Sequence, residues 1–220
     1  VTFGKNKKSD IFPLRIIKSK NLIKIVLKVC NDKIDLDIKN INIYNVLASI
    51  AVINEFSFNV KNIKKIFKNF ELTEGRGKIH IISRYNKKFK LIDESYNANP
   101  LSVKNAIHSF DEIQKKEFKK YLILGDMLEL GQKSEKYHKD LSRVINNSNI
   151  DKVFIKGEKS LFTYKNLHKS KQGNILQNKS DIDLMLSNII NNNDYLMIKG
   201  SNATGLNNLS KKLIKGLNVI

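Results

Sequence analysis

The sequence predicts an α/β protein whose larger, C-terminal part has a Rossmann-like fold, a mostly parallel sheet with helices on both faces. Two observations lead to this prediction. After Gly77, short apolar strands at 121–124, 153–155 and 195–198 alternate with helical stretches, and such alternation requires crossover connections between parallel strands. Before Gly77 the order differs, because a run of strands is followed by helices. The 220 residues are therefore expected to form two domains.

Three strands are expected in the first part of the chain, at residues 11–17, 22–30 and 33–38. Each range is rich in β-branched residues, and the polar breaks between the ranges indicate hairpin turns. The apolar spacing then changes to a helical period. It predicts one helix that begins near Asn42 and a second helix of three turns between residues 60 and 70.

A polar segment at residues 72–77, in which two glycines flank Arg76, is the best candidate for a domain boundary. We place the predicted domains at residues 1–74 and 75–220. A pair of strands is expected directly after the boundary, at residues 78–83 and 89–93. The expected helices of the second domain lie at residues 103–113, 136–146, 182–190 and 206–217.

The composition excludes several classes of protein. The chain carries 40 Lys and Arg residues against 21 Asp and Glu, a net charge of +19 that is typical of nucleic-acid binders. Only four of these cations are arginines, and the basic residues are dispersed through nearly every segment, so we expect no nucleic-acid partner. No apolar run approaches the ~20 residues that cross a bilayer, which favours a cytoplasmic protein without a membrane partner. Cys30 is the only cysteine, which excludes an internal disulfide.

The segment at residues 91–102 is the most informative for function. A predicted strand ends in the carboxylates of Asp93 and Glu94, passes through a polar loop and leads into a helix behind Pro100. The carboxyl ends of parallel strands face the ligand crevice of such sheets, and carboxylates there can accept hydrogen bonds from a ribose diol. An asparagine-rich turn without a ligand is an equally good interpretation of these residues alone. The chain contains neither G-x-G-x-x-G nor a P-loop motif.

Five motifs, in the same order along the chain, resemble those of the Mur ligases that add D-alanyl-D-alanine to the peptidoglycan precursor. They are NIYN at 42–45, GR at 75–76, SYNANP at 95–100, LGDMLELG at 124–131 and KGS at 199–201. The resemblance covers essentially the whole chain. Two positions depart from the family pattern, since Ile41 replaces a usual His and Glu94 replaces a frequent Asp.

The resemblance implies that this chain corresponds to the second half of a family member. Residues 1–74 match the end of the central ATP-binding domain, and residues 75–220 match the C-terminal Rossmann-like domain. The P-loop, the Mg²⁺ ligands and the domain that binds the UDP-muramoyl peptide precede these regions in the family. We therefore expect the chain to be inactive alone, with the missing N-terminal half as a possible separate partner chain. A non-catalytic fragment or interaction module is the alternative.

For the complete ligase, the resemblance implies amide formation that consumes ATP, with Mg²⁺ as cofactor, between the UDP-N-acetylmuramoyl tripeptide and D-alanyl-D-alanine. An acyl phosphate on the tripeptide carboxylate is the expected intermediate. Positioning and charge neutralisation at the transferring phosphoryl group are the main catalytic requirements. No residue of this chain is assigned a catalytic role. The residues expected to bind ATP are Asn42, Asn45, Arg76, Asp93, Glu94, Asn97 and Asn99.

Each of these residues has an expected contact. Asn42 and Asn45 would lie near the adenine, because a carboxamide both donates and accepts hydrogen bonds. Arg76 would contact the ribose or the phosphates as a fixed cation. The acidic pair Asp93 and Glu94 would hold the ribose hydroxyls. Asn97 and Asn99 would complete the contact surface of the loop.

The residues expected to bind the dipeptide are Asp126, Glu129, Lys199 and Ser201. A carboxylate can hold the ammonium group of D-alanyl-D-alanine, and a lysine or hydroxyl can hold its carboxylate. For Asp126, a role as a turn residue or helix N-cap is the alternative. For His138, a position on a helix surface is expected rather than a ligand role. We expect no metal ligands in this chain, since its four histidines share no metal-ligand spacing.

Overall fold

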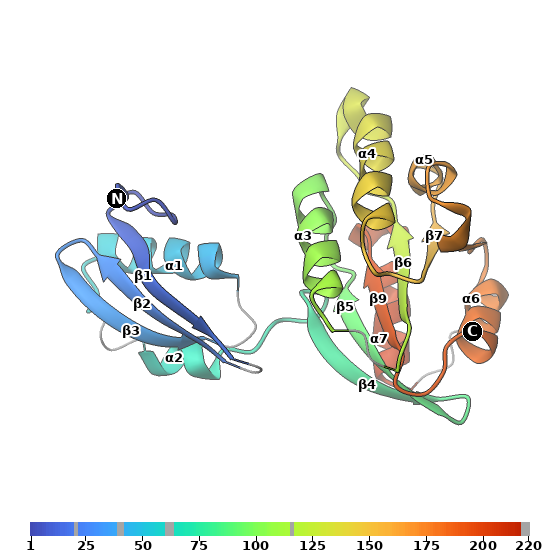
Figure 1. Ribbon diagram of the computed structural model, residues 1–220, viewed down its shortest axis with the longest axis horizontal. Helices are drawn as coiled ribbons and strands as arrows, with labels where there is room; N and C mark the ends of the chain where they lie inside the picture. The colour runs from blue at the N-terminus through green and yellow to red at the C-terminus, as the bar shows by residue number, and fades with distance from the viewer. Residues whose placement is uncertain (20–21, 39–41, 60–63, 115–116, 217–220) are drawn as a thin grey trace. The chain divides into compact units, whose positions relative to one another are not determined.

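The computed structural model describes residues 1–19, 22–38, 42–59, 64–114 and 117–216. The chain divides into two compact units, Val1–Leu72 and Thr73–Ile220, and each is described by itself (Figure 1). The division falls two residues before the end of the predicted first domain at residue 74.

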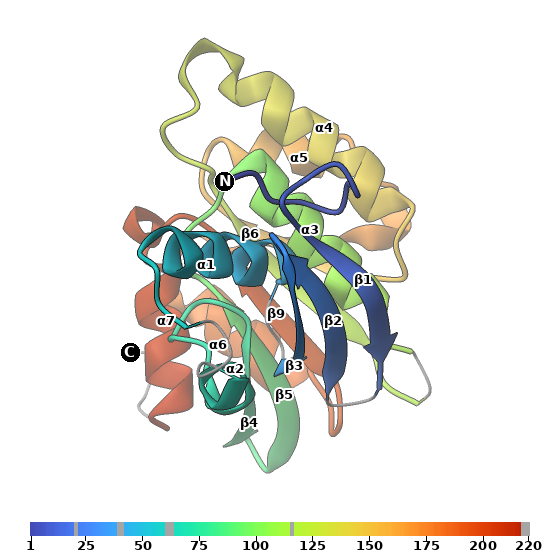
Figure 2. The same ribbon diagram turned by 90° about the vertical axis from the view of Figure 1, so that its left-hand side faces the viewer.

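The first unit is a three-stranded antiparallel sheet with helices against one of its faces. The strands β1 (Ile11–Lys18), β2 (Ile23–Val29) and β3 (Asp32–Ile38) lie side by side in this order (Figure 2). The helices α1 (Ile43–Glu55) and α2 (Lys64–Asn69) cover the face on which the apolar residues of the strands are buried. Part of the predicted second helix, residues 60–63, lies outside the described residues.

The second unit is built on a six-stranded sheet of order β4-β5-β9-β6-β7-β8. Only β4 is antiparallel, through its pairing with β5; every other pairing is parallel. The strands are β4 (Lys78–Arg84), β5 (Lys87–Glu94), β6 (Lys120–Gly125), β7 (Lys152–Lys156), β8 (Gln172–Ile175) and β9 (Tyr195–Lys199). The helices are α3 (Pro100–Asp111), α4 (Ser134–Asn146), α5 (Ser160–Lys165), α6 (Lys179–Asn188) and α7 (Leu206–Ile214).

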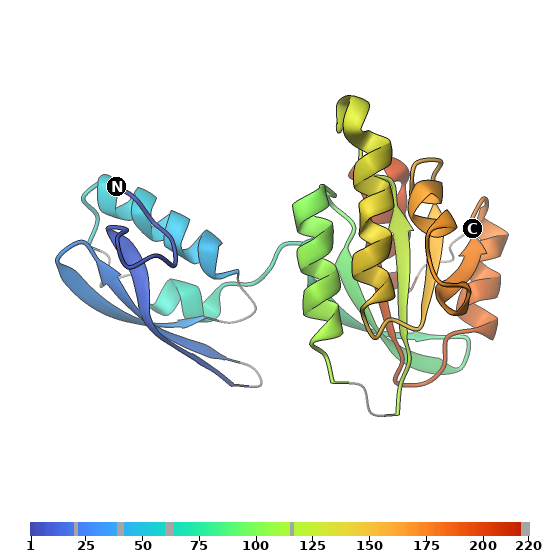
Figure 3. The same ribbon diagram turned by 45° about the horizontal axis from the view of Figure 1, so that its top comes forward.

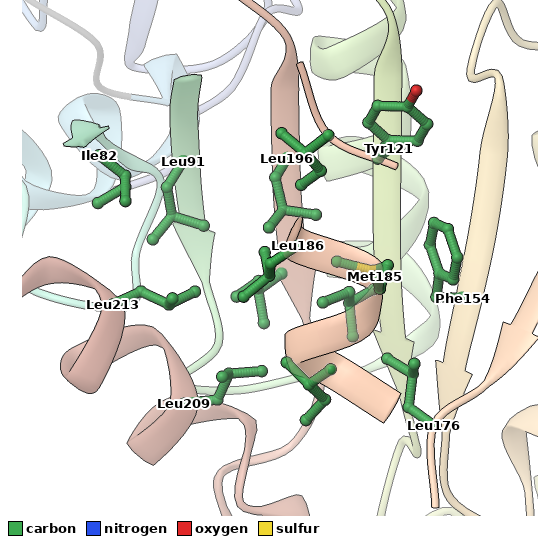
Figure 4. Packing of buried hydrophobic residues seen from close by; sticks show 14 of the residues in the cluster. Ile82, Leu91, Tyr121, Phe154, Leu176, Met185, Leu186, Leu196, Leu209 and Leu213 are labelled. Carbon is green, nitrogen blue, oxygen red and sulfur yellow. The ribbon is translucent and has the colours of Figure 1, made fainter. Parts of the chain in front are cut away.

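Helices cover both faces of this sheet, as the sequence predicts. Figure 3 shows α3 in green and α4 in yellow, side by side on one face. On the other face, α6 and α7 contribute Leu186 and Leu213 to a cluster with Leu91 and Leu196 of the central strands (Figure 4). The central strand β6 is buried along its whole length, which explains its continuous apolar run.

Lys120 is fully buried at the start of β6 and holds the C-terminal end of α3. Its ammonium lies within hydrogen-bond distance of four acceptors that share its three N–H donors: the carbonyl oxygens of Phe110 (2.8 Å), Asp111 (3.1 Å) and Ile113, and Asn149 Oδ1 (2.6 Å). The last carbonyls of a helix have no partner within the helix, and the negative end of its dipole favours a cation. This lysine therefore fixes α3 to the sheet at the edge opposite the candidate site.

Candidate functional site

The carboxyl ends of the parallel strands meet at one edge of the second unit. The strand register pairs Glu94 of β5 with Lys199 of β9, and Gly125 of β6 with Lys156 of β7. Three segments that follow these ends carry most of the candidate residues: the loop 94–99, the turn 125–131 and the tripeptide 199–201. The sheet thus brings together motifs that lie about a hundred positions apart in the sequence, as expected for a ligand crevice.

Asp93 is fully buried and anchors the interdomain segment rather than facing solvent. Its carboxylate accepts hydrogen bonds from the backbone N–H of Gly75 (2.9 Å) and from the hydroxyl of Ser95 (2.6 Å). Gly75 has φ +76°, and a Cβ there would lie 2.6 Å from Tyr96 Cβ, so only glycine fits. Asp93 and Gly75 together determine where the backbone presents Arg76.

Arg76 lies over the ring of Tyr96, with its guanidinium carbon 4.7 Å from the ring centroid. This pair borders a hollow of about 410 Å³ that also has Lys211 of α7 and Asn207 in its walls. Arginine held on an aromatic face keeps its fork of N–H donors available to an anion. Two cations, Arg76 and Lys211, therefore suit the hollow to phosphate oxygens, although Glu74 also lines it.

Both asparagines of the loop make local contacts. Asn99 is the N-cap of α3, and its side chain and that of Ser102 form a capping box. The Asn97 side chain accepts from the N–H of Ala98 at 2.8 Å, while its backbone carbonyl accepts from Lys199. The local bonding expected for an asparagine-rich turn is thus present, and the exposed Asn97 side chain remains next to the hollow's border residue Tyr96.

Lys199 is buried and directed at the loop 94–99. Its ammonium lies 3.3 Å from Glu94 Oε2 and 3.3 Å from the carbonyl oxygen of Glu94. Burial lowers the pKa of Lys199, an effect that the Glu94 carboxylate opposes. The Glu94 side chain is 26% exposed. Its carboxylate therefore pairs with Lys199 and is also accessible from solvent.

The turn 125–131 is held by hydrogen bonds from two directions. The N–H of Ser160, the first residue of α5, donates to Asp126 Oδ1 at 2.7 Å. Ser201 donates its N–H to the carbonyl oxygen of Asp126 (3.0 Å) and accepts from the N–H of Leu128 at its hydroxyl (3.0 Å). Asp126 therefore has the turn and cap contacts that were the alternative to a ligand role, and Ser201 fastens the turn to β9.

His138 is fully buried, so the expected surface position is wrong. Its Nε2 accepts from the N–H of Met127 at 2.9 Å, and Nδ1 therefore carries the proton that is donated to the carbonyl oxygen of Ser134 at 2.8 Å. Nε2 thus fixes the turn 125–131 to α4, while Nδ1 is bonded within α4. The sequence offers only a polar helix stretch around this residue, and nothing in its spacing reveals the contact with Met127.

A second hollow, of about 470 Å³, opens beside Asp126 at the ends of β6, β7 and β8. Its polar wall contains Lys156 and Glu158, which flank Gly157 directly after β7. A Cβ at Gly157 would lie 2.3 Å from Asp126 Oδ1, so the glycine makes room for this carboxylate. Leu128, Leu161, Ile175 and Leu176 supply its apolar wall.

Sequence reasoning missed Lys156 and Glu158, although the strand before them was predicted. Both residues lie at the carboxyl end of a parallel strand, and the argument that predicts ligand contacts at the end of β5 applies equally to β7.

Apart from Asp126, the residues expected to bind the dipeptide do not line the second hollow. Glu129 is exposed on the turn with φ +62°, and Lys199 is absent from the lining of the second hollow.

Asn42 and Asn45 belong to the first unit. Asn42 is the N-cap of α1, where its side chain accepts from the N–H of Tyr44 at 2.9 Å. Asn45 is an exposed residue in the first turn of that helix. Their predicted contacts with adenine stay predictions.

Among the residues that the structure describes, no three or more His, Cys, Asp or Glu side chains are grouped so as to hold a metal ion. None of the helices in the described part of the chain is long and apolar enough to cross a bilayer.

The second unit is thus a Rossmann-like α/β domain with two charged hollows, and it follows a smaller α+β unit in the chain. The family model described as "Mur ligase, glutamate ligase domain" matches residues 75–202. The D-alanyl-D-alanine-adding ligase of Buchnera aphidicola subsp. Baizongia pistaciae is 30% identical over 221 residues, which cover 98% of this chain and 46% of the relative. The corresponding ligase of Bacillus subtilis is 29% identical over 178 residues, covering 79% of this chain and 38% of the relative. This chain belongs to the Mur ligase family.

Solved structures agree with this fold. A MurF structure from Acinetobacter baumannii superposes with a TM-score of 0.76 at 20% identity, covering 96% of this chain and 46% of that one. MurF from Thermotoga maritima, solved in complex with ADP, gives 0.74 at 17% identity over 95% of this chain and 47% of that one. The predicted Rossmann-like domain is thereby confirmed, and the predicted family is confirmed by the family model and the curated relatives. The chain spans less than half the length of these relatives.

Proposed function

We propose that this chain is the C-terminal portion of a ligase that adds D-alanyl-D-alanine to the UDP-N-acetylmuramoyl tripeptide in peptidoglycan precursor synthesis. The ligase would act in the cytoplasm and consume ATP. The relatives with matching sequence are named for this reaction. The observation that carries the proposal to this chain is the second hollow, because carboxylates, an ammonium and an apolar wall surround one space. Such a space suits a small zwitterion with methyl side chains.

The unit Val1–Leu72 is proposed to be the end of the ATP-binding domain, and the unit Thr73–Ile220 to be the C-terminal domain. Since the sequence contains no P-loop, activity requires a region equivalent to the first half of the relatives, in the same or another chain. That region would also supply the Mg²⁺ ligands and the site for the tripeptide. Neither nucleic acid nor a membrane is proposed as a partner.

In the proposed reaction, the tripeptide carboxylate takes the γ-phosphoryl group of ATP, which gives an acyl phosphate and releases ADP. The ammonium of D-alanyl-D-alanine loses a proton to water, and its amine attacks the acyl carbon. Phosphate then leaves, and a second proton is lost as the amide forms. Arg76 would neutralise phosphate charge, with Lys211 as a second cation of the same hollow. Glu94, the exposed member of the acidic pair, would accept from the ribose hydroxyls, while Asp93 and Asn99 would hold the backbone around it.

The second hollow is proposed to receive D-alanyl-D-alanine. Asp126 and Glu158 are the carboxylates that would hold its ammonium group, and Lys156 would meet its terminal carboxylate. Ser201 would act through the turn that it fastens, because its hydroxyl already accepts from Leu128. Glu129 remains a proposed contact from the exposed end of the same turn.

Neutralising the charged wall of this hollow is expected to weaken dipeptide binding. We expect Lys156→Met and Glu158→Gln each to raise the KM for D-alanyl-D-alanine by about tenfold, the loss of one charge-assisted hydrogen bond, with the KM for ATP within about twofold. Steady-state kinetics of the assembled ligase measure both constants. Lys159→Met is the control, since this exposed neighbour does not line the hollow. Equal changes in both KM values would contradict this site.

The reaction itself is tested by phosphate release after the chain is assembled with the region equivalent to the relatives' first half. Release is expected only when ATP, the muramoyl tripeptide and D-alanyl-D-alanine are all present. Phosphate release that is independent of the dipeptide would count against the proposed function.

A further inference from the structure

Lys199 lies between the two candidate subsites, and its contacts decide to which one it belongs. It is the last residue of β9, paired in the sheet with Glu94 on one side and Leu124 on the other. Its side chain turns toward the loop 94–99, and only 2% of it is exposed. The ammonium has three acceptors there, the carbonyl oxygens of Glu94 and Asn97 and the Glu94 carboxylate.

These contacts use the full donor capacity of the side chain. A lysine ammonium has three N–H donors, and each acceptor in the loop can take one of them. A substrate carboxylate would have to displace a loop acceptor and leave a backbone carbonyl without a partner. The second hollow, proposed for the dipeptide, does not have Lys199 in its lining.

We propose that Lys199 is a positioning residue for the nucleotide side of the site: its buried cation holds the loop 94–99 so that Glu94 and the Tyr96 platform under Arg76 keep their places. This inference rests on the proposed function for the identity of the ligand. It replaces the expectation that Lys199 binds the dipeptide carboxylate.

The middle of the loop depends on this cation because its other attachments are long hydrogen bonds, whereas the short ones lie at its two ends. Asp93 holds Ser95 at the start, and the capping box of α3 holds Asn99 at the end. Between them, Tyr96 makes one long backbone bond to Gly75, at 3.3 Å. Two side chains reach this middle part from the end of β9: Lys199 donates to the Asn97 carbonyl, and the Ser201 hydroxyl donates to the Ala98 carbonyl at a longer 3.5 Å.

The two residues after Lys199 contact mainly the turn of the other subsite, apart from the 3.5 Å bond of the Ser201 hydroxyl to Ala98. A Cβ on Gly200 would lie 3.1 Å from Gly125 Cα, so the tripeptide packs tightly against the turn 125–131. Ser201 is bonded to that turn through Asp126 and Leu128. A substitution confined to the Lys199 side chain therefore separates the loop 94–99 from the dipeptide hollow.

The test compares Lys199→Met with Lys120→Met. Both lysines are buried, both donate to backbone carbonyls, and both substitutions remove the charge with little change in volume, but Lys120 holds the end of α3 at the opposite edge. In the 220-residue chain, hydrogen exchange at residues 95–98 is expected to rise at least about tenfold with Lys199→Met and to stay unchanged with Lys120→Met. Equal exchange of the loop in wild type and Lys199→Met would overturn the proposal.

Kinetics of the assembled ligase give the second readout. Lys199→Met is expected to raise the KM for ATP by about tenfold with the KM for D-alanyl-D-alanine within about twofold, because an ordered loop is needed only for the nucleotide. A rise in the KM for D-alanyl-D-alanine alone would show that Lys199 binds the dipeptide, and it would overturn the proposal. A wild-type assembly without ligase activity would refute the proposed function, while the exchange result still decides the role of Lys199. Should Lys199→Met fail to fold, Lys199→Gln, which keeps an amide donor, carries both measurements.

Discussion

Replacing Lys120 by methionine is expected to lower the free energy of unfolding of the second unit by about 3 kcal/mol. The substitution removes the ammonium that the carbonyl oxygens of Phe110, Asp111 and Ile113 share, although the Asp111 carbonyl also accepts from Asn149 Nδ2 at 2.9 Å. It also removes a cation from the C-terminal end of the α3 dipole. Urea denaturation of the chain, followed on the protected amides of β6, measures the loss.

Lys119→Met is the matched control for this prediction. Lys119 is exposed next to Lys120, and its backbone N–H rather than its side chain bonds to Asp194. The control is expected to change the free energy of unfolding by less than about 0.5 kcal/mol. A loss below about 1 kcal/mol for Lys120→Met would mean that water or a rearranged side chain satisfies the three carbonyls.

Removing Arg76 is expected to have the largest effect on activity. In the assembled ligase, Arg76→Ala should lower kcat/KM for ATP by about a hundredfold, the effect of losing one fixed cation at a transferring phosphoryl group. Arg76→Lys should lose roughly tenfold, because it keeps the charge but not the planar fork that lies over Tyr96.

Arg84 provides a close control for Arg76. Its guanidinium lies 5.1 Å from the ring centroid of Tyr85, a similar arrangement on the β4–β5 hairpin, and it forms an ion pair with Asp183. Arg84→Ala is expected to change kcat/KM by less than about twofold, since no candidate residue lies on that hairpin turn. Similar losses for Arg76→Ala and Arg84→Ala would show that stability, rather than phosphate contact, explains the effect.

The fold could be predicted from the sequence wherever a segment was long enough to show a period. The strands around residues 121–124 and 195–198 and the helix of Val103 and Phe110 are examples, because one face or the whole segment is buried. Two elements were missed, β8 and α5. They contain four and six residues, too few for a period to be recognised, and β8 includes Gly173 where Phe154 packs closely.

The segments that form the candidate site could also be predicted from the sequence. Which side chains contact a ligand and which hold the loops in place could not. Asp93 and Lys199 lie in motifs shared with a family of ligases, and both are buried with their polar atoms bonded to neighbouring loops. A sequence motif does not distinguish a residue that touches the ligand from one that holds the loop. His138 shows the same limit, because its partner Met127 is set by the tertiary fold. Lys156 and Glu158 could have been found by applying the strand-end argument to β7.

The central claim is that this chain supplies the dipeptide site of a D-alanyl-D-alanine-adding ligase. The most direct measurement is mass spectrometry of the product when the assembled ligase receives ATP, the muramoyl tripeptide and an equimolar mixture of D-alanyl-D-alanine, L-alanine and D-glutamate. We predict one product, the tripeptide extended by the mass of D-alanyl-D-alanine, and its loss when Lys156→Met and Glu158→Gln are combined. A product that carries either single amino acid, or a dipeptide product that is unaffected by the double substitution, would contradict the claim.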